Sequence, residues 1–329
     1  MTRKNFLETT LASVGAAAMS RGGTMPGGAE LYPVPPLARK NDAKRSLNTA
    51  ENERLFRYMV EQGIKHVVYA GNALVYHMRL AEYTELIEWL SSLTEKASII
   101  PAVGPSYGRA MDEAAIARKG RFDSLLVLPS TSDPRDAAGL EAGLREIANT
   151  AGIPLSLYIK EESNFGSDKE AGLDAIGRLV DSKVCIAIKY AVVRKNPAED
   201  PYLHSLLKRV DASRVVSGIG ERPAVVHLRD FKLAGFTTGS GVIAPKLSLR
   251  LLESCMRGDY AAAEQARQAF LPLEDLRDTW GAPAVLHHAV ALAGIAETGP
   301  LQPFLSPLAA GRLEQIKPAA RALYEKNAA

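Results

Sequence analysis

The sequence predicts a (β/α)8 barrel with a C-terminal helical appendage, and three observations lead to this fold class. Short apolar runs occur eight times, and successive runs begin roughly 19 to 35 residues apart, about the length of a strand, a loop and a helix. Several runs are apolar throughout, as expected of parallel strands that are covered on both faces. Helical patterns lie between them. Eight such units in one chain favour a closed barrel over an open sheet.

The expected strands follow one another from residue 31 to residue 238. They cover Leu31–Pro35, His66–Ala70, Ser98–Val103, Ser124–Leu128, Ile153–Tyr158, Val184–Lys189, Arg214–Ser217 and Leu233–Thr238. Between them, apolar residues recur with the period of a helix, and two of these helical patterns stop at a glycine. The clearest are Leu55, Phe56, Met59 and Val60 before Gly63, Leu140, Leu144 and Ile147 before Gly152, and Leu173, Ile176, Leu179 and Val180 before the sixth strand.

Three segments are expected along the chain. Residues 1–28 form a leader-like or disordered N-terminal segment, residues 29–248 the barrel, and residues 249–329 a set of C-terminal helices. The last segment carries no strand signal, so it is interpreted as the final barrel helix plus a small helical appendage. Its expected helices are one ending at Gly258 and others covering 261–271, 284–296 and 308–324.

The first 28 residues have the layout of an export signal. A basic start over Thr2–Leu7 precedes a small, apolar run that reaches Met19. The start also resembles a twin-arginine leader, although Lys4 occupies the place of the second arginine and Glu8 interrupts the apolar run. Export to the periplasm is favoured, and a disordered extension on a cytoplasmic protein is the alternative. No other run reaches the roughly 18 apolar residues that span a bilayer, so the mature form is expected to have no membrane partner.

Composition excludes several classes of function. Forty Lys and Arg residues oppose 37 Asp and Glu, which leaves a net charge of +3 with no basic block, so nucleic-acid binding is not expected. The two cysteines, Cys185 and Cys255, form no CxxC pair, so neither a zinc site nor a disulfide framework is expected. Both are interpreted as ordinary buried thiols.

Two of the expected strands end on reactive side chains. The fifth ends at Tyr158 and the sixth at Lys189, and the active site of such a barrel lies at the C-terminal ends of its strands. A lysine at an apolar barrel mouth loses hydration, which favours the neutral amine that attacks a ketone to form a Schiff base. Tyr158 would then shuttle protons. In the alternative interpretation, Lys189 extends to solvent and Tyr158 only caps the core.

From Leu31 to Tyr324 the chain resembles the dihydrodipicolinate synthase and N-acetylneuraminate lyase family of class I aldolases. The segments that carry the resemblance are Glu61–Val68, Ile153–Tyr158, Val184–Lys189, Ser217-Gly218 and Arg257–Tyr260. The resemblance implies that Lys189 forms the Schiff base and Tyr158 transfers protons, with no metal or organic cofactor. It also implies a homo-oligomer, either a dimer or a tetramer.

The chain departs from the family pattern at three loops. The Gly-Thr-Thr-Gly-Glu that normally holds the carboxylate of a 2-oxo acid is Ala70–Leu74 here, which leaves Gly71 and Asn72 as the carboxylate-binding candidates. The usual tyrosine pair after the fourth strand is replaced by Ser130 and Thr131. The arginine that follows the catalytic tyrosine in the synthases is missing from Ile159–Asn164, so a role in lysine biosynthesis is not expected.

Other loop residues are weaker candidates for contacts with a substrate. Gly218 belongs to the Ser-Gly of the seventh strand, and Thr237 and Thr238 end the eighth, where they either bind substrate hydroxyls or satisfy their own backbone. The same two interpretations apply to Ser240, Glu221 and Arg222 and to the charged loop Lys160–Glu162. His77 is a candidate to replace the proton-transfer groups that the changed loops have lost.

Three functions remain open from the sequence. The first is a Schiff-base-forming aldolase or dehydratase that acts on a small, sugar-derived 2-oxo acid. The second is a catalytically idle or repurposed barrel that binds a small ligand. The third is the same Schiff-base chemistry on a substrate that lacks the usual 2-oxo carboxylate.

Overall fold

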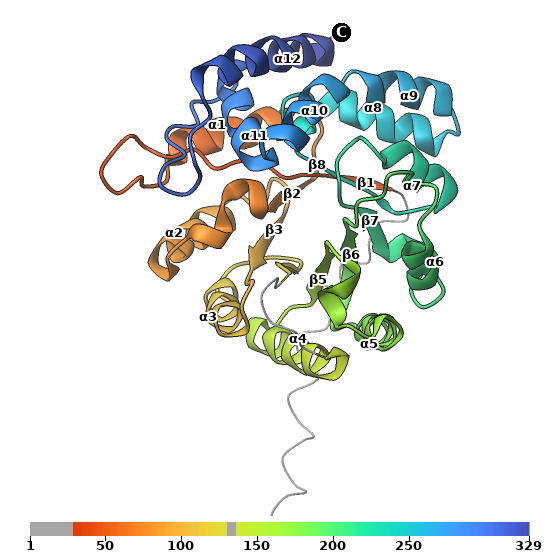
Figure 1. Cartoon of the computed structure of the whole chain (residues 1–329). Helices are drawn as coiled ribbons and strands as arrows, with labels where there is room; N and C mark the ends of the chain where they lie inside the picture. Colours follow the sequence, from red (N-terminus) through yellow and green to blue (C-terminus); the bar gives the residue numbers. More distant parts are fainter. Residues whose placement is uncertain (1–28, 130–135, 329) are drawn as a thin grey trace, which may run out of the picture.

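A computed structural model describes residues 29–129 and 136–328 and confirms the (β/α)8 barrel (Figure 1). The leader-like segment and the two residues Ser130 and Thr131 lie outside the described residues. The strands are β1 (Glu30–Pro33), β2 (His66–Tyr69), β3 (Ser98–Val103), β4 (Leu125–Val127), β5 (Leu155–Ile159), β6 (Cys185–Tyr190), β7 (Val215–Ser217) and β8 (Gly235–Thr238). All are parallel to their hydrogen-bonded neighbours, in the order β1-β8-β7-β6-β5-β4-β3-β2.

Each of the eight expected strands is present, with small differences at the ends. Strands β5 and β6 each continue one residue past the predicted end, so Tyr158 and Lys189 are the penultimate residues of their strands. The two residues lie directly opposite one another in the β5–β6 ladder. The sequence pattern therefore places both side chains at the C-terminal end of the barrel, which we call the mouth.

Helices surround the strands and bury one apolar face each. They are α1 (Thr49–Glu61), α2 (Leu80–Ser91), α3 (Tyr107–Ala117), α4 (Ala137–Ala151), α5 (Lys169–Asp181), α6 (Pro201–Leu207), α7 (Ala224–Asp230) and α8 (Pro245–Met256). Helix α1 buries Leu55, Phe56 and Met59 as its periodicity predicts. Helix α4 begins at Asp136, whose side chain accepts a hydrogen bond from the Gly139 N–H, and ends at Gly152 with a φ of 70°.

Strands β1 and β2 meet without a backbone ladder among the described residues, and side chains join them instead. The rings of Tyr32 and His66 lie 5.0 Å apart, and His66 Nε2 is 3.7 Å from Glu30 Oε2. Above them, the Asn72 side-chain amide donates to the Val34 carbonyl oxygen over 2.7 Å. These three contacts complete the ring of strands at its weakest point.

The C-terminal segment contains one helix more than the sequence predicts. Helices α9 (Tyr260–Gln268), α10 (Leu271–Trp280), α11 (Ala282–Leu292) and α12 (Ala310–Ala328) group on one side of the barrel, next to α8 and α1 (Figure 1). The predicted helix over 261–271 corresponds to α9, and α10 is the helix that the sequence pattern did not predict. Pro272 lies in the first turn of α10, where its missing N–H costs nothing. Helix α11 packs on the loop after β2, so the appendage reaches the mouth.

Two further observations concern the cysteines and the membrane. Cys185 and Cys255 are both free and buried, as predicted. Within residues 29–129 and 136–328, no helix is long and apolar enough to cross a membrane.

Candidate active site

Lys189 and Tyr158 are in direct contact at the mouth of the barrel. The Lys189 Nζ lies 3.6 Å from the centroid of the Tyr158 ring. Both side chains are half-buried. Their positions on neighbouring strands, in register, bring an amine and a phenol together without any contribution from a flexible loop.

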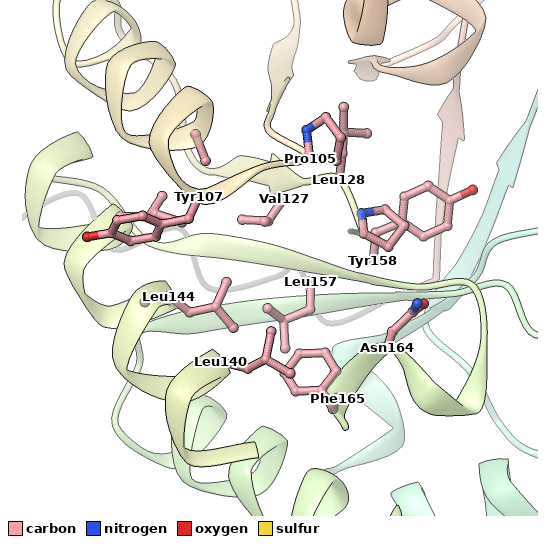
Figure 2. A pocket seen from close by; sticks show the side chains of 14 residues that line it. Pro105, Tyr107, Val127, Leu128, Leu140, Leu144, Leu157, Tyr158, Asn164 and Phe165 are labelled. Atoms are coloured by element: carbon pink, nitrogen blue, oxygen red, sulfur yellow. The ribbon is translucent and has the colours of Figure 1, made fainter. Parts of the chain in front are cut away.

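An apolar pocket of about 50 Å³ lies behind Tyr158, between helices α3 and α4 and strands β4 and β5. Figure 2 shows Leu128, Leu140, Leu157 and Phe165 around this pocket, with the hydroxyl of Tyr158 pointing away from them. The positive charge of Lys189 holds the pKa of the Tyr158 phenol below its ordinary value, while burial opposes this shift. The phenol therefore lies beside a cation that favours its deprotonated form.

The seven residues predicted for the site line one cavity at the mouth. This mouth cavity has a volume of about 190 Å³, and its walls include Gly71, Asn72, Tyr158, Lys189, Gly218, Thr237 and Thr238. They come from the ends of five different strands, as in other barrels whose active sites are built from strand termini. The structure brings the predicted residues together, and their roles in binding remain predictions.

Gly218, directly after β7, lies close to the Lys189 side chain. A Cβ atom at this position would lie 3.0 Å from Lys189 Cγ and 2.7 Å from the Tyr190 carbonyl oxygen. The absence of a side chain at Gly218 therefore leaves the space that the lysine occupies.

Two of the predicted binding residues already use their polar groups within the protein. The Asn72 amide donates to Val34, and the Thr238 hydroxyl donates to Glu221 while accepting from the Gly241 N–H. Thr237 is also buried at the cavity wall. The loop that replaces the threonine pair thus offers a carboxylate fewer free donors than the sequence suggested.

Helix α10 adds three charged residues to the mouth cavity that the sequence pattern does not reveal: Glu274, Arg277 and the exposed Asp278. Glu274 and Arg277 are both buried, pair with each other, and line the cavity. The Ser240 hydroxyl donates to Glu274. The only signal for Glu274 and Arg277 in the sequence was their i, i+3 spacing, which is too common on exposed helices to single them out.

Below Glu274, Glu221 is fully buried. Its Oε1 accepts hydrogen bonds from the Thr238 and Ser248 hydroxyls, while its Oε2 has no partner within residues 29–129 and 136–328. Burial, and then the nearby Glu274, raise the pKa of Glu221 to about 7. This residue therefore supports the wall of the cavity from beneath. Arg222, the next residue, instead forms ion pairs with Asp275 and Asp278 of α10, and Asp278 also lines the mouth cavity.

The loop after β2 provides a tyrosine rather than a histidine near the site. His77 is exposed, whereas Tyr76 packs over Gly71, with its Cε2 3.6 Å from the position of a Cβ there. The pKa of Tyr76 is raised, first by burial and second by the charge of Tyr158. Among the described residues, Tyr76 is thus a second phenol that interacts electrostatically with Tyr158.

A second cavity lies inside the barrel, below the lysine. It has a volume of about 210 Å³ and shares Lys189 and Thr237 with the mouth cavity. Small side chains at Ser124, Ser156 and Ala187 leave this space in the interior, where larger branched residues usually fill a barrel. Lys189 therefore has a largely apolar space beneath it and the more polar mouth above.

Comparison with known proteins identifies a family for this architecture. Residues 34–322 match the model of the dihydrodipicolinate synthetase family. A 4-hydroxy-tetrahydrodipicolinate synthase from Methylobacterium radiotolerans is 22% identical over 266 residues, covering 76% of this chain and 81% of that protein. A probable 5-dehydro-4-deoxyglucarate dehydratase from Rhizobium rhizogenes is 24% identical over 247 residues, covering 72% of this chain and 77% of that protein.

Solved structures show the same fold at low sequence identity. A 4-hydroxy-tetrahydrodipicolinate synthase from Methylacidiphilum fumariolicum superimposes with a TM-score of 0.78 at 21% identity, covering 91% of this chain and 97% of the other. A dihydrodipicolinate synthase from Agrobacterium tumefaciens gives a TM-score of 0.77 at 16% identity, covering 90% and 98%. These matches extend over the barrel and the C-terminal helices alike.

Proposed function

Because the chain belongs to the dihydrodipicolinate synthetase family, a family of lyases, we propose that it is a Schiff-base-forming lyase acting on a small 2-oxo acid. The observation that carries this proposal is the contact between Lys189 and Tyr158 at the barrel mouth, in register on neighbouring strands. An amine beside a phenol of lowered pKa is the pair that imine formation needs.

The reaction begins with a proton transfer. The Tyr158 phenolate takes a proton from the lysine ammonium, and the neutral amine attacks the C2 carbonyl carbon of the substrate. The carbinolamine receives a proton on its hydroxyl group from Tyr158 and loses water, which leaves a protonated imine. This imine accepts the electron pair released when a proton or a carbon–carbon bond at the neighbouring carbon is lost. Water later hydrolyses the product imine and restores Lys189.

The same imine supports two reaction outcomes. Breaking a carbon–carbon bond gives aldol cleavage, and loss of a proton from C3 followed by loss of the hydroxide at C4 gives dehydration. We propose a sugar-derived 2-oxo acid as the substrate, and the dehydratase among the relatives supports this class. A lysine-biosynthetic role is disfavoured because the loop after Tyr158 has no arginine, and its Glu162 pairs with Arg194 and Lys169.

Trapping with borohydride tests the proposal directly. The purified protein is incubated with pyruvate or with sugar-derived 2-oxo acids, reduced, and analysed by intact mass and peptide mapping. We expect a stable adduct on Lys189 that the Lys189→Ala variant does not form. Lys195, an exposed lysine in the loop after β6, provides the matched control. Its variant, Lys195→Ala, should form the adduct normally. Tyr158→Phe should slow adduct formation about 100-fold or more, because it removes the proton shuttle.

A binding barrel without catalysis is the second candidate. The engaged polar groups of Asn72 and Thr238 favour it, since they weaken the usual means of holding a carboxylate. Failure of the folded wild-type protein to form an adduct with any of these 2-oxo acids supports the binding barrel. An adduct that persists in Lys189→Ala would contradict the assignment of the nucleophile.

A further inference from the structure

Arg277 is an unusual component of the mouth cavity because it is a buried cation with unused hydrogen-bond donors. Its exposed fraction is 8%, and it lines the cavity from α10. Nη1 donates to Ser240 over 3.2 Å and to Glu274. Nε is buried without a partner, and Nη2 forms no hydrogen bond to any described residue. An unpaired guanidinium edge inside a protein is costly unless a ligand satisfies it.

The surrounding backbone is shaped around this guanidinium. A Cβ atom at Gly239 would lie 2.2 Å from Arg277 Nη2, and one at Gly220 would lie 2.9 Å from Glu274 Oε2. The loops after β7 and β8 therefore approach the ion pair closely only because glycines stand there. The arrangement holds one face of the guanidinium against Gly239, at the wall of the cavity.

The charged groups near Arg277 allow one more anion to bind there. Among the described residues, Glu274 is the one ion-pair partner of Arg277, and Asp278, which also lines the cavity, pairs with Arg222. Glu221, whose pKa is raised by burial, carries little of its charge below neutral pH. Arginine presents donors in a rigid fork that matches a carboxylate with two hydrogen bonds, and the Nε–Nη2 edge is the one left unused.

The strand register separates Arg277 from the reacting carbon. Lys189 pairs with Val216, and the next residue of β7, Ser217, pairs with Phe236 of β8. Strand β8 ends at Thr238, three residues beyond the level of the lysine and roughly 10 Å along the strand, and Gly239, against which the guanidinium lies, comes next. The lysine side chain and a substrate chain of several carbons together span such a rise. A carboxylate directly attached to the carbonyl carbon would lie nearer the lysine.

We propose that Arg277 binds the distal carboxylate of a 2-oxo dicarboxylic acid whose carbonyl carbon reacts with Lys189. This inference rests on the proposed function and specifies its substrate class. The C-terminal appendage supplies the arginine that the loop after Tyr158 lacks. Glu274 and Ser240 are positioning residues, because they hold Nη1 and leave the Nε–Nη2 edge for the ligand.

A matched pair of probes tests the proposal. 2-Oxoglutarate and 2-oxopentanoate have the same five-carbon chain and differ in the distal carboxylate. For each, the concentration giving half-maximal borohydride-trapped adduct on Lys189 is measured in the wild type, Arg277→Gln and Arg277→Lys. Arg209→Gln is the control, because it removes an arginine that pairs with Glu170 and Asp174 of α5 and does not line the mouth cavity. Circular dichroism and urea unfolding establish that each variant is folded.

The expected result is a selective loss. Arg277→Gln should raise the half-maximal concentration of 2-oxoglutarate at least tenfold and leave that of 2-oxopentanoate within twofold. Arg277→Lys, which keeps the charge opposite Glu274 but not the fork, should give an intermediate loss. Arg209→Gln should change neither value. An equal loss with both probes, or no loss with either, overturns the proposal.

A binding measurement that needs no ketone distinguishes failure of the carboxylate subsite from failure of the Schiff-base function. Glutarate has both carboxylates but no ketone, so its binding is measured by calorimetry in the wild type and in Arg277→Gln. If no adduct forms with any probe but glutarate binding depends on Arg277, the proposed function fails and the carboxylate subsite stands. Glutarate binding that is equal in the two proteins overturns the subsite whatever the trapping shows.

Discussion

The Lys189 side chain has a phenol on one side and a glycine on the other. Tyr158 sets the electrostatic environment, and Gly218 provides the space. A Cβ atom at Gly218 would meet the Tyr190 carbonyl oxygen, the Ala191 Cβ and the Lys189 Cγ, all within 3.0 Å. Because two of these contacts are to the strand that carries the lysine, relief of the clash must move the nucleophile itself.

We therefore expect Gly218→Ala to slow adduct formation with pyruvate at least tenfold. The substitution should also lower the free energy of unfolding by about 1–3 kcal/mol, since it overpacks a closely packed position. The rate of borohydride-trapped adduct on Lys189 and urea unfolding measure the two effects. Gly108→Ala on α3 is the control, because its Cβ meets nothing within 4 Å and helix propensity favours alanine there. Full activity in Gly218→Ala would contradict this account.

The sequence was sufficient to find the chemically reactive pair but not its surroundings. Tyr158 and Lys189 each lie near the end of an apolar run, and the barrel fold then brings strand ends together. Arg277 reaches the same cavity only through the docking of α10, which no periodic pattern encodes. Likewise, the partner of Asn72 is the Val34 carbonyl oxygen, and that contact exists because β1 and β2 close without a ladder.

Among the elements, the loop after β7 is joined to β8 and α8 through one buried carboxyl group. Glu221 accepts hydrogen bonds from Thr238 and Ser248, and Glu274 of α10 lies nearby. Since burial raises the pKa of Glu221 from 4.5 to about 7, the folded state binds its proton more tightly than the unfolded state does. This group therefore stabilises the fold most below pH 4.5, and its contribution is lost as the pH rises through about 7.

We expect Glu221→Gln to be relatively more stable than the wild type as the pH increases from 5 to 8. Glutamine keeps an oxygen acceptor for the two hydroxyls and removes the titration. The difference in free energy of unfolding between variant and wild type should increase by on the order of 3 kcal/mol across this window. Urea unfolding at four pH values measures it. Glu113, whose pKa is also raised to about 7, cancels in the difference because both proteins contain it. Parallel pH profiles would contradict the prediction.

At the scale of the whole molecule, the barrel depends on β8, which pairs with β1 on one side and β7 on the other. The recurring apolar runs predicted all eight strands, because each strand is a local pattern. How the ring closes was not predictable from those patterns. Closure requires Gly235 opposite Glu30 in the β1–β8 ladder and, at the other edge of β1, the side-chain contacts of His66 with Glu30 and Tyr32.

Gly235→Ala tests how far stability and the site both depend on closure. Gly235 has a φ of 130°, and a Cβ atom there would lie 1.8 Å from the Glu30 carbonyl oxygen and 2.7 Å from its nitrogen. Neither backbone atom can move without breaking the β1–β8 ladder. We expect the substitution to lower the free energy of unfolding by at least about 3 kcal/mol, through strain and the lost ladder together.

A control variant separates the effect of disrupting barrel closure from the effect of placing alanine at a positive φ. Gly258 has a φ of 77°, and a Cβ there would meet nothing within 4 Å, so Gly258→Ala should cost only about 1–2 kcal/mol of left-handed strain. Val34 follows β1 and lines the mouth cavity, so opening the β1–β8 seam should also weaken adduct formation on Lys189. Gly258→Ala should leave that reaction unchanged. Equal destabilisation of the two variants in urea would show that closure at Gly235 does not hold the barrel together.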